Sequence, residues 1–215
     1  VKAMHKLIVS SATYRQSSTA SSAMHRRDPE NLFLARGPRK RLSSYEIRDA
    51  ALFVSGLMND KIGGPSVKPY MPPGIWKSIS NAKYEQGTGD DLYRRSMYTY
   101  WRRTVPPPTM MAFNAAARET CVVRTDQTTT PLQALTMMND RFVLERADDF
   151  ARRVLHQAGP TTEDRIALAF TIALGRTASA RELESCKQLI ARQTDRFGAA
   201  GAAEVEQKAL ACLYW

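Results

Sequence analysis

The sequence predicts a mainly α-helical, irregular multi-helix domain with a small central antiparallel β-ribbon and a long loop rich in glycine and proline. Three observations lead to this prediction. Apolar residues recur at helical spacing near both ends of the chain, helix-start signals precede most of these stretches, and one aromatic segment has strand character. We expect one domain over 1–215, helical at 1–60 and 126–215, with the loop and ribbon at 61–125.

The first 40 residues contain two helix signals. Met4 and Leu7 have the spacing of one helix face, and this predicts a helix at the start of the chain. Further on, Asp28 is followed by Pro29, the order expected of a cap and the first helical position. We therefore expect a short second helix that runs from Asp28 through Phe33.

The clearest helix start in the first half is a capping box. Ser43 and Glu46 have the S-x-x-E spacing in which each side chain binds the backbone N–H of the other residue. Apolar residues then follow at helical spacing from Ile47 to Val54. The glycines and proline that begin at Gly63 are expected to end this element.

The middle of the chain combines a long loop with strand-like segments. Residues 61–92 are rich in glycine, proline and lysine and have no sustained period, although Trp76 is expected to anchor them to the core. The segment Arg94–Arg103 alternates aromatic and polar residues, which is typical of a strand. A second strand is expected at Thr120–Val123, with Cys121 buried on it, and the two would form the ribbon.

The second helical part begins with another capping box. Thr130 is a good N-cap, Pro131 suits the first helical position, and Gln133 closes the box. We expect Leu132 and Leu135 to point into the core.

Further helix starts follow at regular intervals. Asn139 or Asp140 caps the next helix, whose apolar stripe is consistent with burial. Thr161 caps a third helix, and Ser179 with Glu182 forms another capping box. An alanine-rich helix ends the chain.

Composition limits the classes of protein that remain. The net charge of +10 and the pI of about 9.8 favour anionic partners such as nucleic acid, acidic polysaccharide or a phospholipid surface. No apolar run approaches the roughly 18 residues of a membrane-spanning helix, and no signal peptide is visible. Because the chain opens with Val1 and runs directly into a helical pattern, we expect it to be a fragment of a longer protein.

The strongest candidate for a binding site is the basic and aromatic ribbon. Such residues can bind phosphate, sulfate, a sugar face or single-stranded nucleic acid. The predicted ligand-binding residues, which include two at the junction with the second helical part, are Arg94, Arg95, Arg102, Arg103, Tyr98, Tyr100, Trp101, Arg124 and Asp126. In the alternative interpretation the aromatic rings pack under the helices, and the arginines pair with Asp49, Glu119 or Asp126.

Other chemistries have weaker support. Cys121 lacks a nearby base in sequence, and the cysteines Cys121, Cys186 and Cys212 are too sparse for a disulfide framework. No H-E-x-x-H, C-x-x-C-H, G-x-S-x-G or P-loop pattern is present, so we expect no metal, haem or nucleotide in this chain. Paired carboxylates for polysaccharide hydrolysis remain an alternative, in a cleft under the loop 61–92.

An ordered set of segments resembles a known family. These segments are "LIVSSATYRQSS", "RLSSYEIRDAALFVSGLM", "GGPSV", "RRSMYTYWRR", "CVVRTDQTTTPLQALTMMND" and "LGRTASARELE". Together they resemble the planctomycete family associated with cytochrome c that is known as domain of unknown function 1553, over nearly the whole chain. The resemblance implies the C-terminal part of a large, exported protein, with another uncharacterised domain and often a haem domain upstream. It implies no catalytic residues.

We therefore expect a non-catalytic interaction or scaffold module, with haem only in an upstream domain and the upstream domains as its first partners. Acidic polysaccharide is a further possible ligand of the ribbon. The alternatives are a hydrolase that acts on polysaccharide and a nucleic-acid-binding protein, and the second rests on charge alone.

Overall fold

The computed structural model describes residues 1–79, 83–123, 125, 127–198 and 202–214. They form two compact units, Val1–Arg41 and Leu42–Trp215, which are described separately below. All regular secondary structure in the described residues is helical, which confirms the prediction of a mainly helical protein. The prediction of a single domain stays a prediction.

The unit Val1–Arg41 contains two helices, α1 (Lys2–Ser10) and α2 (Ser22–Arg27). The helix predicted at the start of the chain is confirmed, and none of its residues is buried. The helix predicted from Asp28 is wrong. The Asp28 carboxylate accepts hydrogen bonds from the backbone N–H groups of Leu32 and Phe33 at 2.8 and 2.9 Å, but these residues form turns. A left-handed φ of 56° at Asn31 takes the chain off the helical path.

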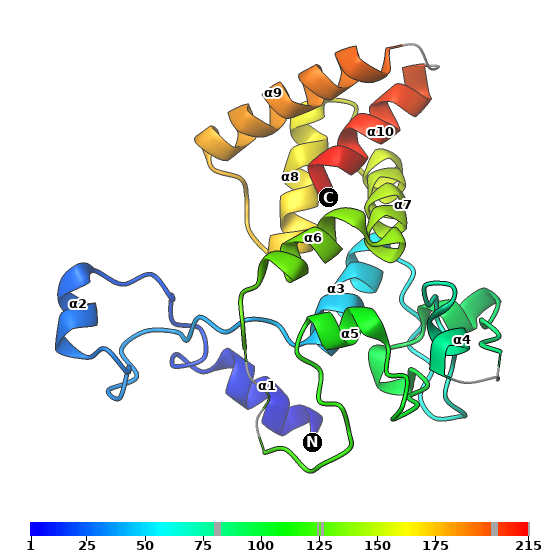
Figure 1. Ribbon diagram of the computed structural model, residues 1–215. Helices are drawn as coiled ribbons and strands as arrows, with labels where there is room; N and C mark the ends of the chain where they lie inside the picture. Colours follow the sequence, from blue (N-terminus) through cyan, green and yellow to red (C-terminus); the bar gives the residue numbers. More distant parts are fainter. Residues whose placement is uncertain (80–82, 124, 126, 199–201, 215) are drawn as a thin grey trace. The chain divides into compact units, whose positions relative to one another are not determined.

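The unit Leu42–Trp215 is mostly irregular in its first part and mostly helical in its second (Figure 1). The first part contains α3 (Ser44–Ser55), α4 (Ile75–Ile79), the 3₁₀ turns η1 (Gly89–Tyr93) and η2 (Ser96–Tyr98), and α5 (Pro108–Ala112). The second part contains α6 (Pro131–Asn139), α7 (Arg141–Gln157), α8 (Thr162–Leu174), α9 (Ala180–Phe197) and α10 (Ala202–Tyr214).

The helix starts predicted at Ser43, Thr130, Thr161 and Ser179 are confirmed. Ser43, Thr130 and Ser179 each accept a hydrogen bond from the N–H of the third helical residue, whose side chain reaches back to the cap. Thr161 does the same at the start of α8. The predicted end of α3 near Gly63 is wrong, because the helix already ends at Gly56, which adopts a left-handed φ of 78°.

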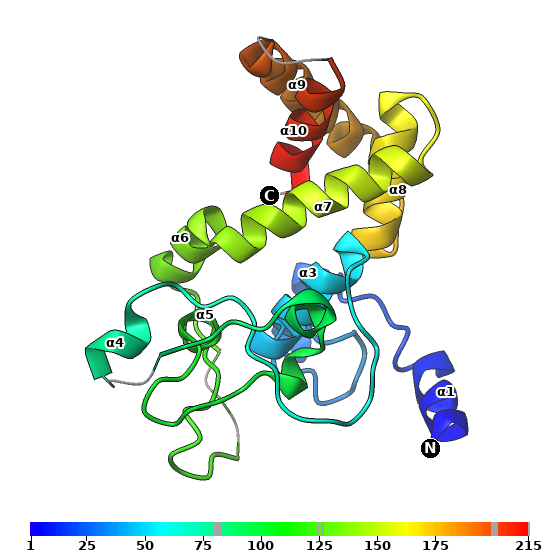
Figure 2. The same ribbon diagram turned by 90° about the vertical axis from the view of Figure 1, so that its right-hand side faces the viewer.

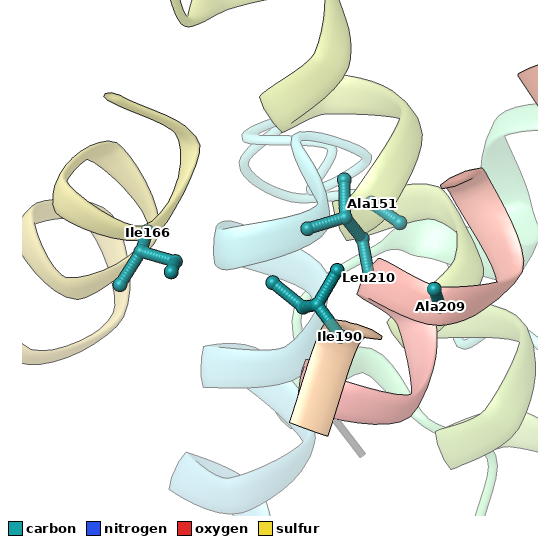
Figure 3. Close-up of a cluster of buried hydrophobic side chains, with 5 residues drawn as sticks. All are labelled: Ala151, Ile166, Ile190, Ala209 and Leu210. Carbon is teal, nitrogen blue, oxygen red and sulfur yellow. The ribbon is translucent and has the colours of Figure 1, made fainter. Parts of the chain in front are cut away.

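The helices α7–α10 form a bundle in which α10 packs against both α7 and α9 (Figure 2). Its central cluster is drawn in Figure 3 and consists of Ala151, Ile166, Ile190, Ala209 and Leu210. A second cluster of Phe150, Val154 and Ala169 lies beside α3, where Val54 packs against it. The predicted apolar stripe of α7 is therefore confirmed.

The predicted β-ribbon is wrong. No strand occurs in the described residues, and the segment Arg94–Arg103 contains the 3₁₀ turn η2 instead. Its strand-like pairing is confined to isolated bridges, in which Arg94 pairs with Asn59 and Thr99 with Val67. The burial does not alternate along the segment: Arg94, Ser96 and Thr99 are buried, which breaks the two-residue period of a strand.

The second predicted strand, Thr120–Val123, is irregular and exposed. Cys121 is exposed, so its predicted burial is wrong, and Val122 and Val123 are exposed as well. Local β-propensity therefore does not lead to pairing here, because no partner strand forms beside this segment in the described residues.

The predicted orientation of α6 is also wrong. Leu132 and Leu135 are exposed, and Gln133 is the buried residue. The Gln133 amide donates a hydrogen bond to Asn114 Oδ1 at 2.8 Å, while its carbonyl oxygen closes the capping box at Thr130. These polar contacts turn Gln133 inward, and the two leucines therefore lie on the outer side of the helix.

Candidate functional site

Arg94 is the most buried of the predicted site residues, with 2% of its surface exposed. Its guanidinium donates hydrogen bonds to the backbone carbonyl oxygens of Lys61, Gly63 and Pro65, at 3.1 Å for Lys61 and 3.0 Å for Pro65. It also lies 3.9 Å from the centre of the Tyr98 ring. Arg94 therefore holds the loop that begins after α3 by contacts inside the protein.

Arg48, which was not predicted as a site residue, organises the neighbouring backbone. From α3 it donates hydrogen bonds to the carbonyl oxygens of Leu92 and Arg94, both at 2.9 Å, and to Ser96 Oγ at 3.3 Å. Burial lowers the pKa of Arg48 to about 10, so the side chain still carries its charge at neutral pH. The only signal in the sequence was a charged residue next to Ile47, at the edge of the apolar stripe of α3.

Asp49 completes this arrangement. Its Oδ1 accepts a hydrogen bond from the Ser96 N–H at 2.7 Å, and Arg95 Nε lies 3.9 Å from its Oδ2. The pairing of an arginine with Asp49 agrees with the alternative interpretation of the ribbon, although Arg95 is half exposed and such a pair adds little stability. We call Arg48, Asp49 and Arg94, with the backbone that they bind, the arginine network.

The other aromatic residues of the predicted site fall into separate local groups. Trp101 Nε1 donates to the Ala117 carbonyl oxygen at 3.3 Å, and the Arg118 guanidinium lies 4.5 Å from a Trp101 ring centre. The Arg102 guanidinium lies 5.0 Å from the Trp76 ring, which is buried as predicted. In both contacts an arginine guanidinium lies over a tryptophan ring of the same protein.

The remaining predicted residues are Tyr100, Arg103, Arg124 and Asp126. Tyr100 packs near Trp76, with a distance of 6.1 Å between ring centres, and Arg103 is exposed. Arg124 and Asp126 lie outside the described residues. Ligand binding by this set stays a prediction.

A pocket of about 110 Å³ adjoins the arginine network. Its walls come from α3, from the segment around Tyr70, from the prolines and first residues of α5, and from the junction of α6 with α7. The lining residues are Ser44, Ile47, Arg48, Ala51, Pro69, Tyr70, Pro72, Thr99, Pro107, Pro108, Thr109, Met110, Phe113, Met137, Asp140, Phe142 and Val143.

The charged groups of this pocket already have partners. The Asp140 carboxylate caps α7 by accepting from the Phe142 N–H at 2.7 Å, and it accepts from the Thr109 hydroxyl at 2.8 Å. The Arg48 guanidinium faces the carbonyl oxygens of the arginine network and lies 5.5 Å from the Phe142 ring. The pocket is therefore mainly apolar, and its charged groups are engaged in hydrogen bonds within the protein.

A further arginine joins α3 to the bundle. Arg153 Nη1, from α7, donates hydrogen bonds to the carbonyl oxygens of Phe53 and Val54 at 2.9 and 2.8 Å. These carbonyls belong to the last turn of α3, where a helix has few backbone donors of its own. The side chain passes close to Gly56, so that a Cβ atom there would lie 3.3 Å from Arg153 Cδ.

Across the described part of the chain, no three histidine, cysteine or acidic side chains gather in a way that could hold a metal ion. Within the same residues, no helix has the length and apolar character required to cross a membrane. All three cysteines are free, and burial raises the pKa of the Cys186 and Cys212 thiols.

These features define a helical protein whose irregular central part is held by Arg48 and Arg94. The family described as "Protein of unknown function (DUF1553)" matches residues 1–190, and the chain belongs to this family. The resemblance seen in the sequence is thereby confirmed as far as the family is concerned. Neither the curated proteins nor the solved structures include one that matches this chain.

Proposed function

We propose that this chain is a non-catalytic interaction module that docks, through the outer face of α6, onto an upstream domain of the same large polypeptide. The observation that carries this proposal is the composition and exposure of α6. The helix Pro131–Asn139 contains no charged residue, although the chain as a whole carries a net charge of +10. Leu132, Leu135 and Met138 are 61%, 60% and 56% exposed.

An exposed and uncharged helix of this kind is typical of a protein contact surface. Free energy is gained when apolar side chains leave water, at about 25 cal/mol per Å² of buried apolar surface. Because α6 offers no cation, its natural partner is a neutral, apolar protein surface. Nucleic acid and acidic polysaccharide suit it poorly, and the Arg94 guanidinium is already engaged by backbone carbonyls.

The position of α6 is fixed from both ends. At its start, Gln133 binds Asn114 and closes the capping box. At its end, Asp140 caps α7 and accepts the hydroxyl of Thr109 from α5. The helix therefore presents its apolar side chains in a defined geometry, so that docking orders few further groups.

The resemblance to the family is the reason for proposing an upstream domain as the partner. The resemblance implies large proteins that are exported and that carry further domains, often with haem, before this one. A docking surface on α6 would fix the orientation of those domains relative to this chain. Under this proposal the module has a scaffolding role, and the haem chemistry belongs to the upstream part.

The docking proposal can be tested by photo-crosslinking in the full-length polypeptide that contains this chain. A benzophenone amino acid at position Leu135 should form crosslinks to residues upstream of this chain, which mass spectrometry would identify. The matched control is the same amino acid at Arg181, an exposed position on α9. The proposal fails if the Leu135 position yields no upstream crosslinks, or no more of them than the Arg181 position does.

Export and the association with haem are tested separately. Cells that produce the full-length polypeptide would be fractionated, and the polypeptide would be stained for covalently bound haem. We expect it outside the cytoplasm and positive for haem. A cytoplasmic, haem-free polypeptide would contradict this part of the proposal and leave the docking surface of α6 unaffected.

A further inference from the structure

Two hydroxyl groups that line the pocket beside the arginine network have no hydrogen-bond partner among the described residues. They are Ser44 Oγ, at the start of α3, and Thr99 Oγ1, just after η2. Both residues are deeply buried, with 4% and 5% of their surfaces exposed. A buried polar group without a partner is destabilising, so a protein rarely keeps two of them in one place.

The local backbone does not account for either hydroxyl. The cap of α3 is provided by Ser43, whose side chain accepts from the Glu46 N–H, so Ser44 is not required for capping. The backbone N–H of Thr99 donates a hydrogen bond to the Ser96 carbonyl oxygen at 3.1 Å. This bond does not involve the Thr99 hydroxyl. Each hydroxyl can donate one hydrogen bond and accept others.

The rest of the pocket limits what could bind these hydroxyls. Ile47, Met110, Phe113 and Val143 supply apolar walls, as do four prolines. The carboxylate of Asp140 and the guanidinium of Arg48 already make hydrogen bonds within the protein, so neither is free to pair with an ionic ligand. A charged molecule would lose its hydration without a counter-ion in return.

The volume sets the size of the ligand. The pocket measures about 110 Å³. For comparison, an apolar cavity of about 150 Å³ in an unrelated protein is known to hold a benzene molecule. With small side-chain adjustments the pocket therefore suits a molecule of one ring or a short chain.

We propose that this pocket binds a small, neutral, largely apolar molecule that carries one hydroxyl or carbonyl oxygen, which Ser44 and Thr99 recognise. The oxygen atom of the ligand satisfies the two hydroxyls, and its hydrocarbon part contacts the apolar walls. Ser44 reaches the pocket from α3 and Thr99 from the segment that Arg48 holds in place. The arginine network thereby positions one half of the recognition pair against the other.

The test compares phenol with toluene, which have nearly the same shape and differ in one hydroxyl group. Methyl NMR of methionine-labelled protein would follow binding, because Met110 and Met137 line the pocket and Met58 does not. We expect phenol to shift the Met110 and Met137 signals at millimolar concentration and to bind about tenfold more tightly than toluene, as one well-made hydrogen bond predicts. Absence of phenol binding, or equal binding of both probes, would overturn the proposal.

Variants of Ser44 and Thr99 test whether their hydroxyls cause the preference for phenol over toluene. In the double variant S44A/T99V the side chains keep their approximate shape, and the preference for phenol over toluene should disappear. The matched control is Ser55→Ala, because Ser55 is a buried serine on the same helix whose hydroxyl donates to the Leu52 carbonyl oxygen outside the pocket. If S44A/T99V retains the preference, the hydroxyls do not recognise the ligand.

A second variant covers the case in which S44A/T99V does not fold. Ala51→Ile, at a half-buried position of α3 that lines the pocket, adds volume to the pocket wall and should abolish binding of both probes. Unchanged binding in a folded Ala51→Ile protein would place the ligand elsewhere and contradict the proposal. The comparison of phenol with toluene on the unmodified protein requires no variant at all.

Discussion

The two parts of the unit Leu42–Trp215 are held together by different interactions. In the bundle α7–α10, apolar side chains at helical spacing meet in clusters such as the one around Leu210 (Figure 3). In the part that precedes α6, the backbone is mostly irregular, and Arg48 and Arg94 bind its carbonyl oxygens directly. The bundle is stabilised mainly by burial of hydrocarbon, and the irregular part by hydrogen bonds from a few cations.

An irregular backbone requires hydrogen-bond donors from elsewhere in the sequence. A helix satisfies its own carbonyls, whereas a loop depends on side chains or water. Arginine is well suited to this task because one guanidinium has five N–H donors in a rigid plane. Arg94 uses them on three carbonyl oxygens from the loop that follows α3.

The largest expected effect comes from the bundle. Leu210→Ala removes a side chain that is 1% exposed and leaves a cavity between α7 and α10, so the free energy of unfolding should fall by about 3–4 kcal/mol. Leu174→Ala, at an exposed leucine of α8, is the control and should cost less than about 0.5 kcal/mol. Urea unfolding followed by circular dichroism measures both. Equal losses would mean that the cluster around Leu210 does not stabilise the bundle.

The second-largest loss of unfolding free energy is expected in the arginine network. Arg94→Leu keeps hydrocarbon at the site but removes the donors to three carbonyl oxygens, and it should cost about 2–3 kcal/mol. Arg103→Leu changes the charge equally at an exposed position, where we expect a change within about 0.5 kcal/mol. The same urea titration compares them. If Arg94→Leu is as stable as the control, the network does not hold the irregular part.

The third effect separates backbone strain from side-chain contact at two helix ends. Gly56 and Gly175 end α3 and α8 with φ values of 78° and 65°. Alanine in a left-handed conformation costs about 1 kcal/mol, which is the loss expected for Gly175→Ala, where a Cβ atom meets nothing within 4 Å. Gly56→Ala should cost more, because its Cβ would lie 3.3 Å from Arg153 Cδ. If both variants lose the same free energy of unfolding in the urea titration, the Arg153 side chain moves away from the added Cβ atom at no cost.

The smallest expected effect is a pH-dependent loss of local stability at the start of α9. The pKa of the Glu182 carboxyl is lowered far below its usual range, first by hydrogen bonds from Arg176 and then by the backbone and hydroxyl of Ser179. Since the folded pKa is the lower one, this contribution is present above the unfolded pKa of about 4.3 and is lost as the pH falls further. Hydrogen exchange in the first turn of α9 should therefore become faster below that pH.

The matched variants for this pH effect are Glu182→Gln and Glu184→Gln. Glu182→Gln should make hydrogen exchange in the first turn of α9 much less sensitive to acid, beyond the intrinsic pH dependence of exchange. Glu184 lies outside the capping box and instead accepts a hydrogen bond from Gln188 at 2.8 Å, so its variant should retain the effect. An unchanged acid response in Glu182→Gln would show that Glu182 does not govern the helix start.

The helix starts could be predicted from the sequence because their chemistry is local. Ser43 with Glu46 and Ser179 with Glu182 form capping boxes within four residues, and no distant contact is needed to recognise them. The apolar stripe of α7 is predictable for the same reason, since burial follows from its spacing.

The irregular centre and the pocket could not be predicted, because their contacts join residues that are far apart. Arg94 binds carbonyl oxygens about 30 positions earlier in the chain, and such contacts have no periodic signature. High β-propensity therefore suggested a ribbon where Arg94 instead fixes a loop. Similarly, Ser44 and Thr99 meet at one pocket only after the chain has folded.

The two hydrogen bonds from Arg153 to the end of α3 have a consequence for folding cooperativity. They attach the part that precedes α6 to α7, beside the packing of Val54 on the cluster of Phe150, Val154 and Ala169. Local opening of the arginine network would have to break this attachment or disturb α7 as well. The amides of the last turn of α3 should therefore exchange with solvent together with those of α7, as one cooperative opening unit.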